Sequence, residues 1–144
     1  MSGFITTERP DGILYWRFED FRRATSDEWT AAFRRILREL DAQNGHFRCL
    51  VHFGKGALPT PYMTQEAIEA MKDIPPNLAM SVAMVSENKM MFNIVRFAMN
   101  SVSNIDYIRF FDSDEEGIVW LKERQKAFLA KNLARRQLPR NETQ

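Results

Sequence analysis

The stretch Phe47-Arg-Cys-Leu-Val-His-Phe53 decides the expected fold. It is a short run rich in apolar, β-branched and aromatic residues, and it is bounded by the turn-forming residues Gly45 and Gly54. A run of this length and composition is typical of an interior strand that is covered on both faces. The run therefore predicts a central strand with other elements packed on either side of it.

Strand and helix signals alternate around this run. Pro10-Asp-Gly12 between β-forming residues predicts an opening hairpin. Thr25, with Glu28 three residues later, has the pattern of a capping box and predicts the start of the first helix. The expected strands are 4–7, 13–18, 47–53, 78–85 and 105–111, and the expected helices are 25–43, 61–74, 86–100 and a last helix that begins near 113.

This alternation predicts an α/β fold with a mixed sheet of four to five strands, an N-terminal hairpin and about four helices. A chain of 144 residues is the length of one ordinary domain, so we expect residues 1–144 to form a single unit. From about residue 131 the chain is basic, and this tail is expected to be loosely held.

Composition narrows the classes of partner. Lysine and arginine number 20 against 19 aspartates and glutamates, so the net charge of +1 creates no overall field toward nucleic acid or membrane. The densest apolar stretch, 90–99, has about half of the ~20 residues needed to cross a bilayer, and Asn93 and Arg96 interrupt it. We therefore expect neither a nucleic-acid partner nor a membrane span.

The number of cysteines and the first residues of the chain indicate the cellular compartment. Cys49 is the single cysteine, so it cannot form a disulfide within the chain. The first residues lack the basic start and the apolar run of a secretory signal. A cytoplasmic location is expected.

Two segments of the second half carry a family resemblance. The first is Leu78-Ala-Met-Ser-Val-Ala-Met-Val-Ser-Glu-Asn88 followed by an apolar helix, and the second is Ile108-Arg-Phe-Phe-Asp-Ser-Asp-Glu-Glu-Gly-Ile-Val-Trp-Leu121. They resemble small bacterial STAS-like domains, relatives of the anti-sigma-factor antagonists, with Arg109 and Trp120 among the matching positions. The resemblance implies a STAS-like fold.

The regulatory members of that family carry an Asp-Ser pair at the start of the helix after the central strand, where phosphorylation switches partner binding. The matching segment here, 54–61, contains no serine, and Thr60 and Thr64 are the nearby hydroxyls. We therefore carry over no regulatory or catalytic residue, and the phosphorylation of either threonine stays open.

Cys49 and His52 form the obvious pair of nucleophile and base to test. They lie three positions apart on one expected strand, where side chains alternate between faces with a period of two. Their side chains are therefore expected on opposite sides of the sheet, with Cys49 in a packing role and His52 as a hydrogen-bonded ring.

Acidic residues from Asp112 to Glu123 come close to a calcium-loop pattern, with Asp114, Glu116 and Gly117 at matching positions. The residues before this cluster, however, are expected to form a strand, whereas a calcium hand needs a helix. Acidic residues are also favoured in the first turn of a helix, where the helix dipole is positive. We expect no metal and no cofactor here.

The expected third helix, 86–100, is apolar over an unusually wide arc. Its polar residues, Lys89, Asn93, Arg96 and Asn100, fall in one narrow stripe. The rest of the helix surface is apolar, and a sheet packed against the helix would normally cover only part of it. Another helix of the domain, a second subunit or an apolar ligand is expected to cover the rest, and methionine side chains suit the last two.

These patterns predict a non-enzymatic protein-interaction or regulatory domain that forms a homodimer. The alternative is a carrier or sensor of a small apolar ligand or lipid bound beside the Met-rich third helix. A third hypothesis is an enzyme that uses His52 or the acids of 112–116. The predicted interaction surface consists of Met90, Met91, Phe92, Val95, Met99, Thr60 and Tyr62.

Overall fold

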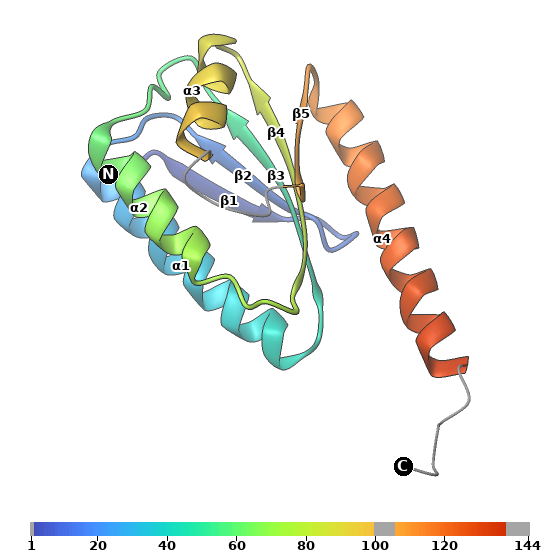
Figure 1. Ribbon diagram of the computed structural model, residues 1–144. Helices are drawn as coiled ribbons and strands as arrows, with labels where there is room; N and C mark the ends of the chain where they lie inside the picture. The colour runs from blue at the N-terminus through green and yellow to red at the C-terminus, as the bar shows by residue number, and fades with distance from the viewer. Residues whose placement is uncertain (1, 100–105, 138–144) are drawn as a thin grey trace.

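The computed structural model describes residues 2–99 and 106–137, and it contains a five-stranded mixed sheet (Figure 1). The strands lie side by side in chain order: β1 (Phe4–Glu8), β2 (Leu14–Phe18), β3 (His46–Phe53), β4 (Ala79–Ser86) and β5 (Ile108–Phe111). The helices are α1 (Arg23–Ala42), α2 (Pro61–Lys72), α3 (Met90–Met99) and α4 (Asp114–Gln137). β1 runs antiparallel to β2, and every other neighbouring pair is parallel. The predicted fold class is confirmed.

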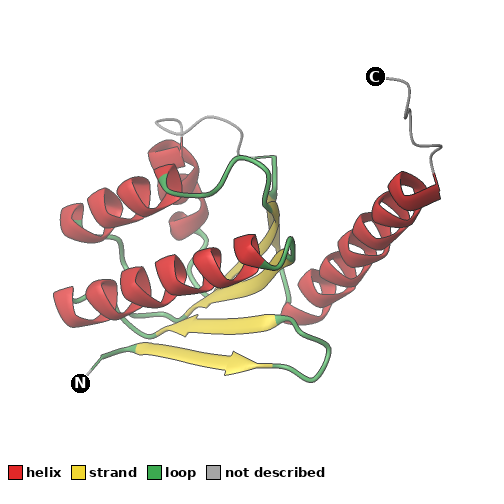
Figure 2. Ribbon diagram, turned by 90° about the horizontal axis from the view of Figure 1, so that it is seen from below, coloured by secondary structure: helices red, strands yellow, loops and turns green. Residues whose placement is uncertain are grey.

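Helices cover both faces of the sheet. α1, α2 and α3 lie on one face, and α4 lies on the other (Figures 1 and 2). Successive side chains of β3 alternate between these two layers, so Cys49 and Val51 join the core under α1 to α3, whereas Leu50 packs with α4. The prediction that β3 is covered on both faces is therefore confirmed.

The opening hairpin forms as its turn residues predict. Gly12 has a φ of 83°, a conformation that costs glycine little and other residues much. Its N–H donates to the carbonyl of Arg9 at 2.9 Å, and the Arg9 N–H donates to the carbonyl of Ile13 at 3.0 Å. These bonds set the register in which Glu8 opposes Leu14.

The first helix begins two residues before the predicted cap. Arg23 is its first residue, and no side chain caps it. The hydroxyl of Thr25 instead accepts the N–H of Gly3 at 2.8 Å and donates to the Asp20 carboxylate at 2.6 Å. The capping-box interpretation of Thr25 is therefore wrong, because this hydroxyl holds the N-terminal residues against the helix.

The third helix is shorter than expected. Ser86 ends β4, and α3 begins at Met90. The side-chain oxygen of Asn88 accepts the Met90 N–H at 3.0 Å, so the residues before Met90 form a turn that leads into the helix. Lys89 therefore lies outside the helix, and Asn100 lies outside the described residues.

At the C-terminus, 131–137 continue α4, and 138–144 lie outside the described residues.

Within the described ranges, no helix combines the length and the apolar character needed to cross a bilayer.

The fully buried side chain of Leu121 anchors α4 to the sheet. Leu121 is 0% exposed and packs with Ile13, Leu50 and Ala83. One turn earlier, the backbone of α4 comes so close to the sheet that a Cβ on Gly117 would lie 2.9 Å from a methyl carbon of Leu50. This close approach explains why glycine occupies that position.

We predict that Leu121→Ala lowers the free energy of unfolding by about 3 kcal/mol, because truncation of a fully buried leucine removes contacts and leaves a cavity. Val119→Ala, in the same helix but 57% exposed, should change stability little. Urea unfolding of both variants tests this expectation, and similar losses in the two variants would contradict it.

Candidate functional site

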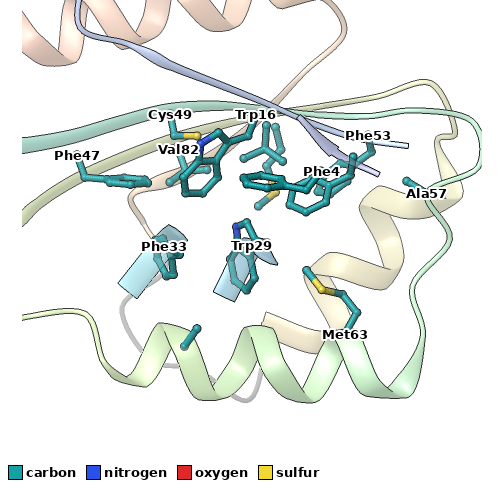
Figure 3. Close-up of a cluster of buried hydrophobic side chains, with 14 of the residues drawn as sticks. Phe4, Trp16, Trp29, Phe33, Phe47, Cys49, Phe53, Ala57, Met63 and Val82 are labelled. Atoms are coloured by element: carbon teal, nitrogen blue, oxygen red, sulfur yellow. The ribbon is translucent and has the colours of Figure 1, made fainter. Parts of the chain in front are cut away.

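The main core contains a partly open cavity of about 130 Å³ on the face of the sheet that α1, α2 and α3 cover. Inward side chains of β2, β3 and β4 line it from one side, and side chains of α2 and α3 line it from the other. Figure 3 shows part of this cluster, in which Trp29, Phe33 and Met63 reach from the helices toward the strand side chains. The lining includes Trp16, Phe47, Cys49, Val51, Val82 and Met84 from strands, Met63, Thr64, Ala67, Ile68 and Met71 from α2, and Met91, Ile94 and Val95 from α3.

The cavity wall is almost entirely apolar. None of the described residues that line it carries a charge. An engineered apolar cavity of about 150 Å³ in another protein stays dry and binds benzene, so this cavity is large enough for a molecule near that size. Its walls are also adaptable, because methionine side chains fill irregular space; five line the cavity, namely Met63, Met71, Met80, Met84 and Met91.

The half-exposed lining side chains mark where the cavity approaches solvent. Thr64 and Ile68 on α2, Ile94 on α3, and Tyr107 and Ile108 at β5 are only partly covered, whereas the lining residues of β2, β3 and β4 are buried. The cavity therefore approaches solvent on the side of α2, α3 and the start of β5. Cys49 is fully buried at the sheet side of the cavity, and burial raises the pKa of its thiol well above its usual range.

The residues of the predicted interaction surface differ in how far the structure buries them. Met91 is only 3% exposed and lines the cavity, and Val95 packs against the same core. Phe92 packs against Phe110 in a tilted arrangement, with ring centroids 4.8 Å apart. Met91 therefore belongs to the core and not to an exposed surface, whereas Phe92 and Val95 are half-buried. The side chain of Met99 lies outside the described ones.

The exposed apolar side chains of α3 form a different set. Met90 is 66% exposed, Ile94 is 37% exposed and Phe97 is 79% exposed. Spacings of four and three residues place these three on one side of the helix. Of the predicted surface on α3, only Met90 belongs to this exposed set among the described side chains.

Thr60 and Tyr62 serve internal contacts. The Thr60 hydroxyl accepts the Met63 N–H at 3.0 Å and so caps α2, as its sequence predicts. The Tyr62 hydroxyl donates to the Asp27 carboxylate, and the Arg23 guanidinium lies 4.3 Å from the ring centre. The hydrogen bond to Asp27 raises the pKa of Tyr62 to about 12. Both contacts of Tyr62 join α2 to α1.

A polar cluster lies at the carboxyl ends of β3 and β4. The ring of His52 is hydrogen-bonded to Asp114 through Nδ1 at 2.8 Å and to Glu87 through Nε2 at 2.9 Å. Tyr15 donates to the second oxygen of Asp114 at 3.1 Å, and Arg17 donates to Glu87 at 3.1 Å. The bonds from His52 and Arg17 hold the pKa of Glu87 below its ordinary value.

This cluster brings together His52 and Asp114, two residues of the enzyme hypothesis whose proximity the sequence pattern does not reveal. Both ring nitrogens already have carboxylate partners within the protein, and these contacts account for the position of His52. No cysteine, serine or threonine joins these hydrogen bonds within the described part of the chain. Cys49 lies on the other face of the sheet, which confirms that it forms no dyad with His52. The arrangement fastens the start of α4 to the sheet.

The acids of the calcium-like pattern point to different partners. Asp112 pairs with Lys89 at 2.8 Å, and this contact lowers the pKa of the carboxyl. Asp114 bonds to His52 and Tyr15, while Glu116 and Glu123 are exposed. Across the described residues, no three His, Cys, Asp or Glu side chains are grouped as metal ligands.

No protein-family model, curated protein or solved structure matches this chain. The relationship to STAS-like domains therefore stays a prediction.

A second histidine fastens the middle of α4. His46 contacts Gln125 through Nδ1 at 2.8 Å and Ser81 through Nε2 at 2.7 Å. The Ser81 oxygen also accepts the Nε–H of Arg124 at 2.8 Å. A neutral ring that donates to Gln125 and accepts from Ser81 satisfies every one of these contacts. Burial, with a smaller effect from the Arg48 and Arg124 cations, lowers the pKa of His46 below its ordinary value.

We predict that acid weakens the fold through His46. The unfolded chain takes up this proton near pH 6.5, whereas folded His46 resists it to a lower pH, so stability is complete above 6.5 and falls as the pH drops. His46→Gln should reduce the fall. Urea unfolding at pH 7.5, 6.5 and 5.5 measures it, and an unchanged pH dependence in the variant would refute the assignment.

Proposed function

We propose that this protein binds a small apolar molecule in the cavity between the sheet and helices α2 and α3, as a carrier or sensor and without catalysis. The observation that carries the proposal is a cavity of about 130 Å³ whose lining residues bear no charge. The Met-rich third helix contributes Met91 to the wall. The buried free thiol of Cys49 is compatible with the expected cytoplasmic location.

An energetic argument supports a ligand. Unfilled space of about 130 Å³ beside the core forfeits packing contacts that a fully packed core would make. Protein interiors normally contain few voids larger than a water molecule. A molecule that fills this space restores the lost contacts, and this gain favours binding.

The polar clusters support a binding role over catalysis. His52 has both ring nitrogens bonded to carboxylates, and His46 has both bonded to Gln125 and Ser81. The Cys49 thiol is buried in the apolar layer with a raised pKa, so it is a poor nucleophile. Each of these three residues has a packing or positioning role that accounts for its surroundings.

We predict that Ala67→Leu removes ligand binding, because Ala67 lines the cavity and a larger side chain occupies the same space. Toluene is the probe. At ten times its dissociation constant it should stabilise the wild type by about 1.4 kcal/mol, which raises the melting temperature by about 3–6 °C. The rise should saturate in the wild type and vanish in Ala67→Leu, as measured by circular dichroism.

Ala31→Leu is the matched control, since Ala31 is exposed on α1 and the chemical change is the same. It should keep the toluene response of the wild type. A wild type without a saturable rise would refute the proposed function, and so would an equal rise in the Ala67→Leu variant.

A second candidate function is self-association through α3. Met90, Ile94 and Phe97 present exposed apolar side chains on one side of this helix, and the exposure of Phe97 is unusual for so large an aromatic ring. A twofold contact would cover them in a homodimer. A protein partner with an apolar surface would cover them equally well, so this face also supports the interaction domain that the sequence predicts.

We predict that Phe97→Lys weakens self-association more than tenfold, because an apolar interface would bury an unpaired ammonium. Asn93→Lys adds the same charge at an exposed polar position of the same helix and should have little effect. Light scattering across protein concentration measures both. A wild type that stays monomeric at several hundred micromolar would exclude the homodimer.

A further inference from the structure

Two polar groups with no partner lie at the apolar cavity. The indole N–H of Trp16 and the hydroxyl of Tyr107 are buried, and neither has a hydrogen-bond partner among the described residues. Both residues line the cavity. Trp16 is 2% exposed, so solvent does not reach its nitrogen from outside.

An unpaired buried donor calls for an explanation. Folded proteins leave few buried polar groups unsatisfied, because each one loses its hydrogen bonds to water without a replacement. The indole N–H can only donate, so it requires an acceptor. In Figure 3 the Trp16 nitrogen lies on the side of the ring toward Cys49 and Val82, two other residues of the cavity lining.

Tyr107 offers a second donor. Burial raises the pKa of Tyr107 to about 12, so its hydroxyl keeps its proton at neutral pH and can donate. Its backbone is fixed by the Val82 N–H, which donates to the Tyr107 carbonyl at 2.9 Å. The backbone of Tyr107 is therefore held beside β4, and Val82 of β4 also lines the cavity.

Water is a poorer occupant than an organic acceptor. A buried water molecule usually makes two to four hydrogen bonds, and it needs that many polar partners. The wall around Trp16 is dominated by aromatic, aliphatic and methionine side chains. A ligand with one acceptor oxygen satisfies the indole N–H and places its remaining atoms against apolar groups.

We propose that the ligand is a neutral, largely apolar molecule with one acceptor oxygen, such as a ketone, which accepts the N–H of Trp16. This inference rests on the proposed function and specifies the class of ligand. Tyr107, which also lines the cavity with an unpaired hydroxyl, is a second candidate donor to such a ligand. A carboxylate is disfavoured, because none of the described lining residues supplies a cation.

The test compares acetophenone with ethylbenzene, which share the ring and a two-carbon chain and differ in the carbonyl oxygen. Isothermal titration should show acetophenone binding about tenfold tighter to the wild type, the ratio that one buried hydrogen bond provides. Trp16→Phe should bring this ratio to about one. Trp120→Phe, a change on the other face of the sheet, should leave the ratio unchanged.

A measurement on the wild type guards against a Trp16→Phe variant that fails to fold. The indole N–H resonance of Trp16, assigned by elimination with Trp29→Phe and Trp120→Phe, should shift downfield with acetophenone and not with ethylbenzene. An unchanged resonance would overturn the inference.

The remaining outcomes separate the two proposals. Ethylbenzene binding as tightly as acetophenone, or tighter, would overturn the acceptor inference and leave the apolar-ligand function standing. If neither compound binds, both proposals are overturned. An acetophenone preference that persists in folded Trp16→Phe would show that a group other than the indole recognises the oxygen, and this too would overturn the inference.

Discussion

The need to bury β3 on both faces governs this architecture. Phe47, Cys49 and Leu50 are at most 1% exposed, although Phe47 and Cys49 point to one side of the sheet and Leu50 points to the other. From β2 to β5 the chain advances through the sheet in one direction, and right-handed crossovers then place every connecting helix on the same face. α1, α2 and α3 are those helices, so α4 alone remains to cover the second face. α4 reaches the inner strands and leaves Ile5 of β1 exposed.

The sequence predicts the architecture well because its signals are local. The run from Phe47 to Phe53, the Pro-Asp-Gly turn and the Thr60-Pro61 helix start each depend on neighbouring residues, and the structure confirms all three. The cap at Thr25 fails for the opposite reason. Its hydroxyl has partners at Gly3 and Asp20, and one of them is 22 positions away, where the local pattern carries no information.

The candidate site was only partly predictable. The pattern of α3 indicated an apolar ligand as one of three alternatives, but a cavity depends on how closely helices approach a sheet. Trp16, Phe47 and Val82 would look like ordinary core residues in any sequence. The pairing of His52 with Asp114 joins residues 62 positions apart, and no spacing rule connects them. Met91 and Met90 were indistinguishable in the pattern, yet one is buried and its neighbour is exposed.

The two faces of the sheet differ in how firmly they are closed, and this difference has a kinetic consequence. On the α4 face, the side chains of His46 and His52 bond at four points, two of them on the helix itself and two on the strand ends beside it. On the other face, α2 and α3 meet over a cavity. A molecule bound in this cavity, as we propose, would enter where the wall is only partly covered. If α2 and α3 must part to admit it, its association rate would fall below the rate of diffusional encounter. The residence time of a bound molecule would then depend on the packing between α2 and α3 as much as on its contacts with the cavity wall.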